Sequence, residues 1–150
     1  MAYHWTLHID APLEKVFDTL ADVEHHPEWA NPKAKLSMSS VSGGPPALGS
    51  KYRSEQVFVG KAQTADIEIV RFDRPSRFAF AISQRKRGGS GKDVHYTHTF
   101  VLSPEDGGTK LQRTTDGDGN KLVGFLAKPA IMKDGRTSLG NLKARVEASD

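Results

Sequence analysis

The chain has 150 residues, of which 37% are hydrophobic and 26% are charged, and its formal net charge is +3. These values are typical of one globular domain, residues 1–150, and exclude a disordered or fibrous chain. The lack of cysteine excludes a disulfide framework, a thiolate zinc site and a thiol nucleophile. The first ten residues lack a secretory signal pattern and no apolar run is long enough to cross a bilayer, so we expect a cytoplasmic protein without a membrane span.

The N-terminal region predicts a strand followed by two short helices. Trp5, Leu7 and Ile9 alternate with polar residues, as in a strand with one buried face. An amphipathic stripe after the strand predicts a short helix, which Pro12 would start; its members are Leu13, Val16, Phe17 and Leu20. A second helical turn or two is expected over residues 22–29, ending at Asn31-Pro32 because the residue before a proline avoids helical geometry.

Six alternating runs separated by turn-forming residues follow, and they predict an antiparallel meander. The expected strands are Lys35 to Ser39, Lys51 to Val59, Ala62 to Phe72, Arg77 to Gln84, Asp93 to Leu102 and Thr109 to Thr115. The pattern allows a β-bulge at Ile69-Val70. The glycine-rich stretches "GGSGKD" and "DGDGNK" lack required positions of a phosphate loop and of a calcium loop, and are interpreted as turns.

The region from Leu122 to Ala148 returns to helical spacing and predicts a long helix with one stripe facing the sheet. The stripe consists of Met132, Gly135, Leu139, Leu142 and Val146. Pro129 lies inside this region, so the helix either starts near it or is kinked there. Gly135 costs about 1 kcal/mol of helix propensity relative to alanine. Room for something beneath the helix would explain its presence.

Four stretches of this chain carry a likeness to a known family: "IDAPLEKVFDTLADVEHHPEW", "ALGSKYR", "EIVRFDRPSRFAF" and "FVLSPEDGGTKLQRT". On these stretches the chain resembles the START-like, Bet v 1-like (SRPBCC) superfamily and within it the polyketide cyclase/dehydrase and lipid-transport group, and the resemblance extends over essentially the full chain. The resemblance implies an α+β helix-grip fold. In this fold a seven-stranded curved antiparallel sheet wraps around a long C-terminal helix, with two short helices between the first and second strands.

The stretch "HHPEW", residues 25–29, combines two histidines with a carboxylate and an indole. Adjacent residues on a helix point about 100° apart, so His25 and His26 cannot both bind one metal ion from a regular helix. A third ligand at suitable spacing is also missing. The resemblance implies that Trp29 packs the second helix against the sheet and that the histidines are exposed. We therefore expect no metal and no cofactor.

Strand alternation predicts which side chains face the interior. If Phe100 and Leu102 point inward, Tyr96 and His98 do so too, and Leu111 likewise brings Arg113 with it. Inward polar groups would be costly without partners or water, which suggests a partly wet ligand cavity. Its expected lining is Tyr52, Gln56, Phe58, Phe80, Tyr96, His98, Phe100, Arg113, Phe125, Met132 and Gly135.

The alternative is a purely structural network. In that case Tyr96, His98 and Arg113 would pair with acidic neighbours such as Asp66 or Glu68 and stabilise the sheet. The sequence leaves both possibilities open.

Three functions are compatible with these features. The first is binding, for carriage or sensing, of a hydrophobic, partly polar small molecule such as a lipid, polyketide or aromatic metabolite. The second is a cofactor-free cyclase or dehydratase with His98 as general acid or base and Tyr96 or Arg113 steadying an enolate oxygen.

The third is toxin-like binding of ribosomal or other macromolecular material through a basic turn, which comprises Arg85, Lys86, Arg87 and Lys92. A single basic turn argues against general nucleic-acid binding, which needs a broad basic face with interleaved aromatic residues. We expect a monomer or homodimer.

Overall fold

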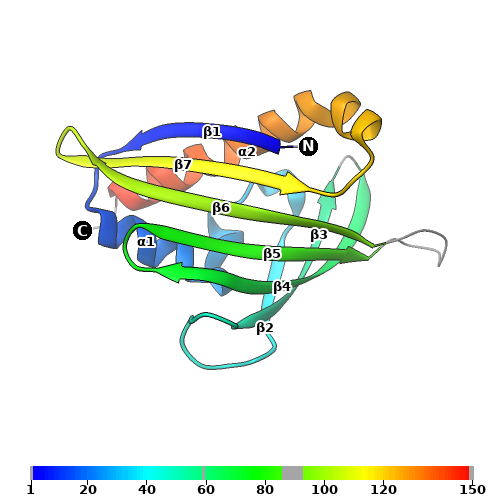
Figure 1. Cartoon of the computed structure of the whole chain (residues 1–150), viewed down its shortest axis with the longest axis horizontal. Helices are drawn as coiled ribbons and strands as arrows, with labels where there is room; N and C mark the ends of the chain where they lie inside the picture. The colour runs from blue at the N-terminus through cyan, green and yellow to red at the C-terminus, as the bar shows by residue number, and fades with distance from the viewer. Residues whose placement is uncertain (1, 59, 86–92, 149–150) are drawn as a thin grey trace.

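The computed structural model describes residues 2–58, 60–85 and 93–148. Within this part of the chain, seven strands form one antiparallel sheet in the order β1-β7-β6-β5-β4-β3-β2, and the helix α2 lies against one face of it (Figure 1). The elements are β1 (Ala2–Ile9), α1 (Leu13–Ala21), the 3₁₀ helices η1 (Val23–Glu28) and η2 (Pro32–Ala34), β2 (Ser37–Ser40), β3 (Lys51–Phe58), β4 (Lys61–Asp73), β5 (Arg77–Arg85), β6 (Val94–Glu105), β7 (Gly108–Gly117) and α2 (Lys121–Ala148). The predicted α+β helix-grip arrangement is confirmed.

The segment between α1 and β2 differs from the prediction in detail. The helical turns over residues 22–29 form the 3₁₀ helix η1, and Pro32 does not end the helical region but starts η2. Asn31 caps η2, because its side-chain oxygen accepts a hydrogen bond from the backbone N–H of Lys33 at 3.2 Å. Lys35 has a φ of 47°, which no strand residue adopts, so β2 begins at Ser37 rather than at Lys35.

The strands β6 and β7 extend further than the sequence pattern predicts. The turn between them consists of Asp106 and Gly107 alone, with φ angles of 44° and 77°. Positive φ at both central residues is the geometry of a tight two-residue hairpin, which favours an Asp-Gly pair. The β-bulge that the pattern allowed near Ile69 is confirmed, since the register of β4 against β5 shifts between Ile69 and Arg71.

The helix α2 begins at Lys121 and continues through Pro129. The predicted alternative in which the helix starts near this proline is therefore wrong. Asn120 caps the helix: its side-chain oxygen accepts hydrogen bonds from the backbone N–H groups of Leu122 and Val123, at 2.9 and 3.2 Å. The first turns overhang the sheet and expose several large apolar side chains, namely Leu122, Val123, Phe125 and Leu126. The helix is buried only from Gly135 onward.

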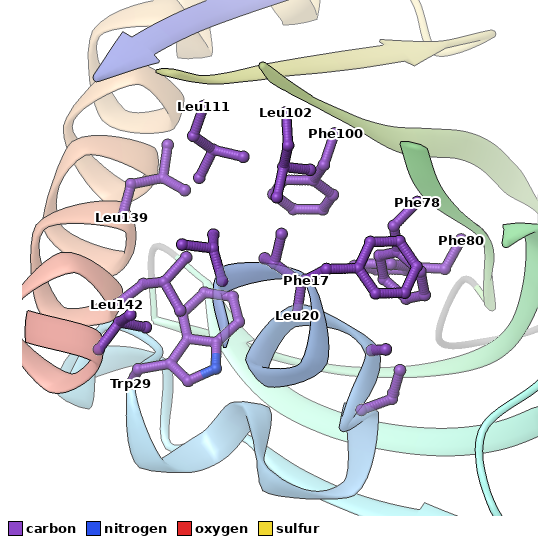
Figure 2. Close-up of a cluster of buried hydrophobic side chains, with 14 of the residues drawn as sticks. Phe17, Leu20, Trp29, Phe78, Phe80, Phe100, Leu102, Leu111, Leu139 and Leu142 are labelled. Atoms are coloured by element: carbon purple, nitrogen blue, oxygen red, sulfur yellow. The ribbon is translucent and has the colours of Figure 1, made fainter. Parts of the chain in front are cut away.

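The hydrophobic core lies at the end of the sheet where α1 and the C-terminal half of α2 come together. Figure 2 shows side chains of α1, α2 and the strands converging there. Phe17 of α1 makes edge-on contacts with the rings of Phe72 and Phe78, at centroid distances of 5.2 and 5.9 Å. Leu142 of α2 is completely buried. This closed end fixes the C-terminal half of the helix against the sheet, whereas the first turns of α2 keep their large apolar side chains exposed.

Candidate ligand-binding site

Two rows of side chains cross the inner face of the sheet, because paired residues on neighbouring antiparallel strands point to the same side. From β1 through β7 and β6 to β5, the first row is Tyr3, Thr115, His98 and Phe80. The second row is Trp5, Arg113, Phe100 and Phe78. The sheet therefore brings His98 and Arg113 together on the face predicted from alternation, surrounded by aromatic rings.

His98 accepts a hydrogen bond from Arg113. The guanidinium Nη2 lies 3.0 Å from Nδ1 of His98, and the hydroxyl of Thr115 lies 2.6 Å from the same nitrogen. A guanidinium can only donate, and Nη2 lies closer to Nδ1 than to Nε2, which is 3.4 Å away, so we assign Nδ1 as the acceptor and the proton of the neutral ring to Nε2. The aromatic ring of Phe80 lies 5.0 Å from the imidazole, between centroids.

Burial controls the charges of this group. Desolvation lowers the pKa of His98 well below its usual value, and the Arg113 cation lowers it further. Burial also raises the pKa of Tyr96 to about 12 and lowers that of Arg113 to about 10. At neutral pH the site therefore holds a neutral imidazole, a neutral phenol and one positive charge.

These groups remain partly accessible although they are strongly desolvated. Tyr96, His98 and Arg113 each keep some solvent-accessible surface, and so do Gln56 of β3 and Met132 of α2. By contrast, Phe100 is almost completely buried. The candidate site is therefore the space beside these partly accessible residues of the inner face, where polar groups lie among aromatic side chains.

Gly135 does not line this space. A Cβ atom at this position would lie 2.4 Å from Cε2 and Cζ2 of Trp5, far closer than van der Waals contact. The Trp5 indole also donates a hydrogen bond from Nε1 to the backbone oxygen of Met132 at 3.2 Å. The room beneath the helix, expected to serve a ligand, is filled by the protein's own tryptophan.

Other residues of the predicted lining have different positions. Phe125 is 64% exposed on the overhanging turns of α2, so its placement in the interior was wrong: helical spacing does not show where the sheet ends. The side chain of Phe58 lies outside the described residues. Tyr52 and Phe80 are buried on the inner face, at 3% and 6% exposure, and contribute to its apolar part.

The two acidic partners named in the structural alternative, Asp66 and Glu68, form ion pairs with other residues. Asp66 forms an ion pair with Arg53 and Glu68 with Lys51, at 3.4 and 3.9 Å, on the outer face of the sheet. An open groove of about 600 Å³ follows this outer face. Lys51, Arg53, Asp66 and Glu68 of this groove have exposed side chains that are paired with each other, so we do not place the candidate site there.

His26 is the main residue that the sequence analysis misplaced. It is 4% exposed, and its Nε2 donates to the backbone oxygen of Leu20 at 2.6 Å. Burial lowers the pKa of His26 to about 4. A 3₁₀ helix has three residues per turn, so Val23, His26 and Trp29 share one buried face. The spacing of three between these residues could have predicted the burial of His26. It was missed because α-helical geometry was expected for this segment.

The expected positions of His25 and Trp29 are confirmed. His25 is exposed, with its Nδ1 2.8 Å from a carboxylate oxygen of Asp22, and Trp29 is packed in the core (Figure 2). In the described ranges, no group of three or more histidine or acidic side chains could hold a metal ion. None of the helices found in those ranges is long and apolar enough to cross a membrane.

Residues 4–147 match the family described as polyketide cyclase / dehydrase and lipid transport, and the chain belongs to this family. Its fold is that of the Bet v 1-like proteins. The structure of Ara h 8.0201 superposes with a TM-score of 0.73 at 17% identity, over 99% of both chains. Protein CV1439 from Chromobacterium violaceum gives 0.72 at 17% identity, again over 99% of both chains.

A protein from Arthrobacter aurescens is similar as well, with a TM-score of 0.76 at 13% identity over 99% of this chain and 87% of that one. No curated protein matches. At such low identities the similarity to solved structures establishes the fold alone, and the function has to be argued from the site.

Proposed function

We propose that the protein binds a hydrophobic, partly polar small molecule between the inner face of the sheet and α2, beside Tyr96, His98 and Arg113. The observation that carries the proposal is the set of desolvated yet partly accessible polar groups on an otherwise apolar inner face. A closed structural core would bury such groups completely and pair them. The family description, which includes lipid transport, supports the same conclusion.

Carriage or sensing fits the site better than cyclase or dehydratase chemistry. A general base works best with a pKa near the working pH, and burial places the pKa of His98 well below its usual value. Neutral imidazole is also a weak acid, and the Arg113 hydrogen bond occupies Nδ1, the nitrogen that would take up a proton. Toxin-like binding depends on a basic turn whose residues 86–92 lie outside the described residues, as does the side chain of Arg85.

The proposal is tested with Nile red, a neutral dye that fluoresces in apolar surroundings, and with native mass spectrometry of the gently purified protein. Gln56→Trp places an indole on the inner face, whereas Glu55→Trp places the same group on the outer face of the same strand. We expect wild type and Glu55→Trp to bind the dye, and Gln56→Trp to bind it at least about tenfold more weakly.

Circular dichroism spectra confirm that both variants are folded. Equal dye affinities for the two variants, or no dye binding and no small-molecule adduct on wild type, would refute the proposed function.

A further inference from the structure

Arg113 lies between aromatic rings in the middle of the inner face. Its guanidinium carbon is 4.8 Å from the ring centroid of Trp5 and 5.9 Å from that of Phe100. Cation–π contacts of this kind stabilise a guanidinium and hold it in a fixed plane, but they leave its N–H groups available. The arginine is therefore fixed in position at a desolvated place.

In the part of the chain that the structure describes, no carboxylate forms an ion pair with the charge of Arg113. The carboxylate of Asp134 favours the charged form of Arg113 only electrostatically, and its Oδ1 accepts a hydrogen bond from Asn31 at 3.0 Å. A buried cation without a paired anion is unusual, because removing it from water costs several kcal/mol unless a counter-charge is present.

The hydrogen-bonding capacity of Arg113 is also incompletely used. Nη2 donates to the neutral ring of His98, while Nε is buried without any partner. Nη1 has no protein partner and is not buried, so it is reached by solvent. Arg113 thus has an N–H group, on Nη1, that is free to donate. Its hydrogen-bond acceptor, the ring of His98, is neutral and does not compensate the positive charge.

We propose that the ligand carries a carboxylate, which binds the open side of Arg113 while its apolar body lies against the aromatic residues of the inner face. This inference rests on the proposed function and narrows the ligand class to carboxylic acids. The carboxylate supplies the missing counter-charge and accepts the unused guanidinium hydrogen bonds, which are stronger than bonds between neutral groups. Without the ligand, the same charge is a cost to the folded protein.

The test compares carboxylic acids with their methyl esters, which have nearly the same shape but no charge. Dodecanoic acid and 2-naphthoic acid, each with its ester, are measured by displacement of Nile red at neutral pH. The proteins are wild type, Arg113→Met and Arg53→Met, the last removing an exposed outer-face arginine. We expect wild type and Arg53→Met to prefer at least one acid over its ester by about tenfold or more, and Arg113→Met to reduce this ratio to about one.

The outcomes separate the two proposals. Equal affinities for acid and ester in wild type would refute the proposal that a ligand carboxylate binds Arg113, and so would a preference for the acid that survives in Arg113→Met. Either result would leave the proposed binding of a small molecule intact. Absence of binding of the dye, the acids and the esters would refute both. Arg113→Gln, which keeps a polar side chain but removes the charge, is measured in parallel and should also lose the preference, so the test does not depend on one variant folding.

Discussion

The indole of Trp5 lies directly against the backbone of α2 at Gly135. The indole Nε1 donates a hydrogen bond to the backbone oxygen of Met132, and two carbon atoms of the indole ring occupy the space that a side chain at position 135 would need. This contact joins the first strand to the final helix, two elements at opposite ends of the chain. It also holds the ring on which the Arg113 guanidinium rests.

Gly135→Ala should destabilise the protein by up to about 2 kcal/mol, measured as the free energy of unfolding in urea. Overpacking of a tight contact costs about 1–3 kcal/mol, whereas the gain in helix propensity from Gly to Ala is only about 1 kcal/mol. The matched control is Gly140→Ala in the same helix, where an added Cβ would meet no atom within 4 Å. It should stabilise the protein by roughly 0.5–1 kcal/mol. If both substitutions stabilised the protein, the Trp5 ring would have to move away from an added Cβ at position 135 at little energetic cost.

The buried His26 should make the stability depend on pH. Its pKa is about 4 in the folded protein and near 6.5 in the unfolded chain, so the unfolded state binds more protons between these values. Stability is therefore greatest above pH 6.5 and falls as the pH falls toward 4. Between about pH 7 and about pH 5, wild type should lose about 2 kcal/mol more than His26→Gln.

Glutamine at position 26 can still donate a hydrogen bond to the Leu20 oxygen but does not titrate. Urea unfolding of both proteins across this pH range gives the difference directly. Carboxylates far from residue 26 contribute to both profiles alike, so parallel profiles would show that His26 is not kept neutral by the fold.

The sequence was sufficient to predict the fold and the inward orientation of His98 and Arg113. Strand alternation works for β6 and β7 because their pairing continues without a bulge from Tyr96 to the turn, so buried Phe100 and Leu111 correctly indicate the orientation of His98 and Arg113. The buried stripe of α2 from Gly135 to Val146 was also predicted correctly, because its residues follow a single uninterrupted helical period.

The errors come from information that is not local. Gly135 could not be assigned because the group that fills the space beside it, Trp5, belongs to the other end of the chain. Phe125 was misplaced because a helical pattern carries no signal for the point at which a helix passes the edge of a sheet. His26 was misplaced because 3₁₀ and α-helical periods assign opposite exposure to the same residue.

The β6–β7 turn should tolerate asparagine at position 106 but not alanine at position 107. Both residues have positive φ, which glycine adopts freely and asparagine or aspartate adopt with little strain. Gly107→Ala should therefore lower the free energy of unfolding by about 1–2 kcal/mol, while Asp106→Asn should leave it within about 0.5 kcal/mol of wild type. Urea unfolding distinguishes the two, and equal losses would contradict this turn geometry.

If Arg113 serves a ligand rather than the fold, its removal should not harm the unliganded protein. Arg113→Met replaces a buried, unpaired charge with an apolar side chain of similar length, so we expect the free energy of unfolding to rise by about 1 kcal/mol. The lost contacts with His98 and Trp5 offset part of this gain.

Leu111→Ala provides the comparison, since Leu111 is the inner-facing neighbour of Arg113 on β7, is completely buried and has no polar role. It should destabilise the protein by about 2–5 kcal/mol. A loss of similar size in Arg113→Met would assign the arginine to the structural core. A gain, together with loss of the preference for carboxylic acids, would indicate that the fold tolerates this charge for the sake of binding.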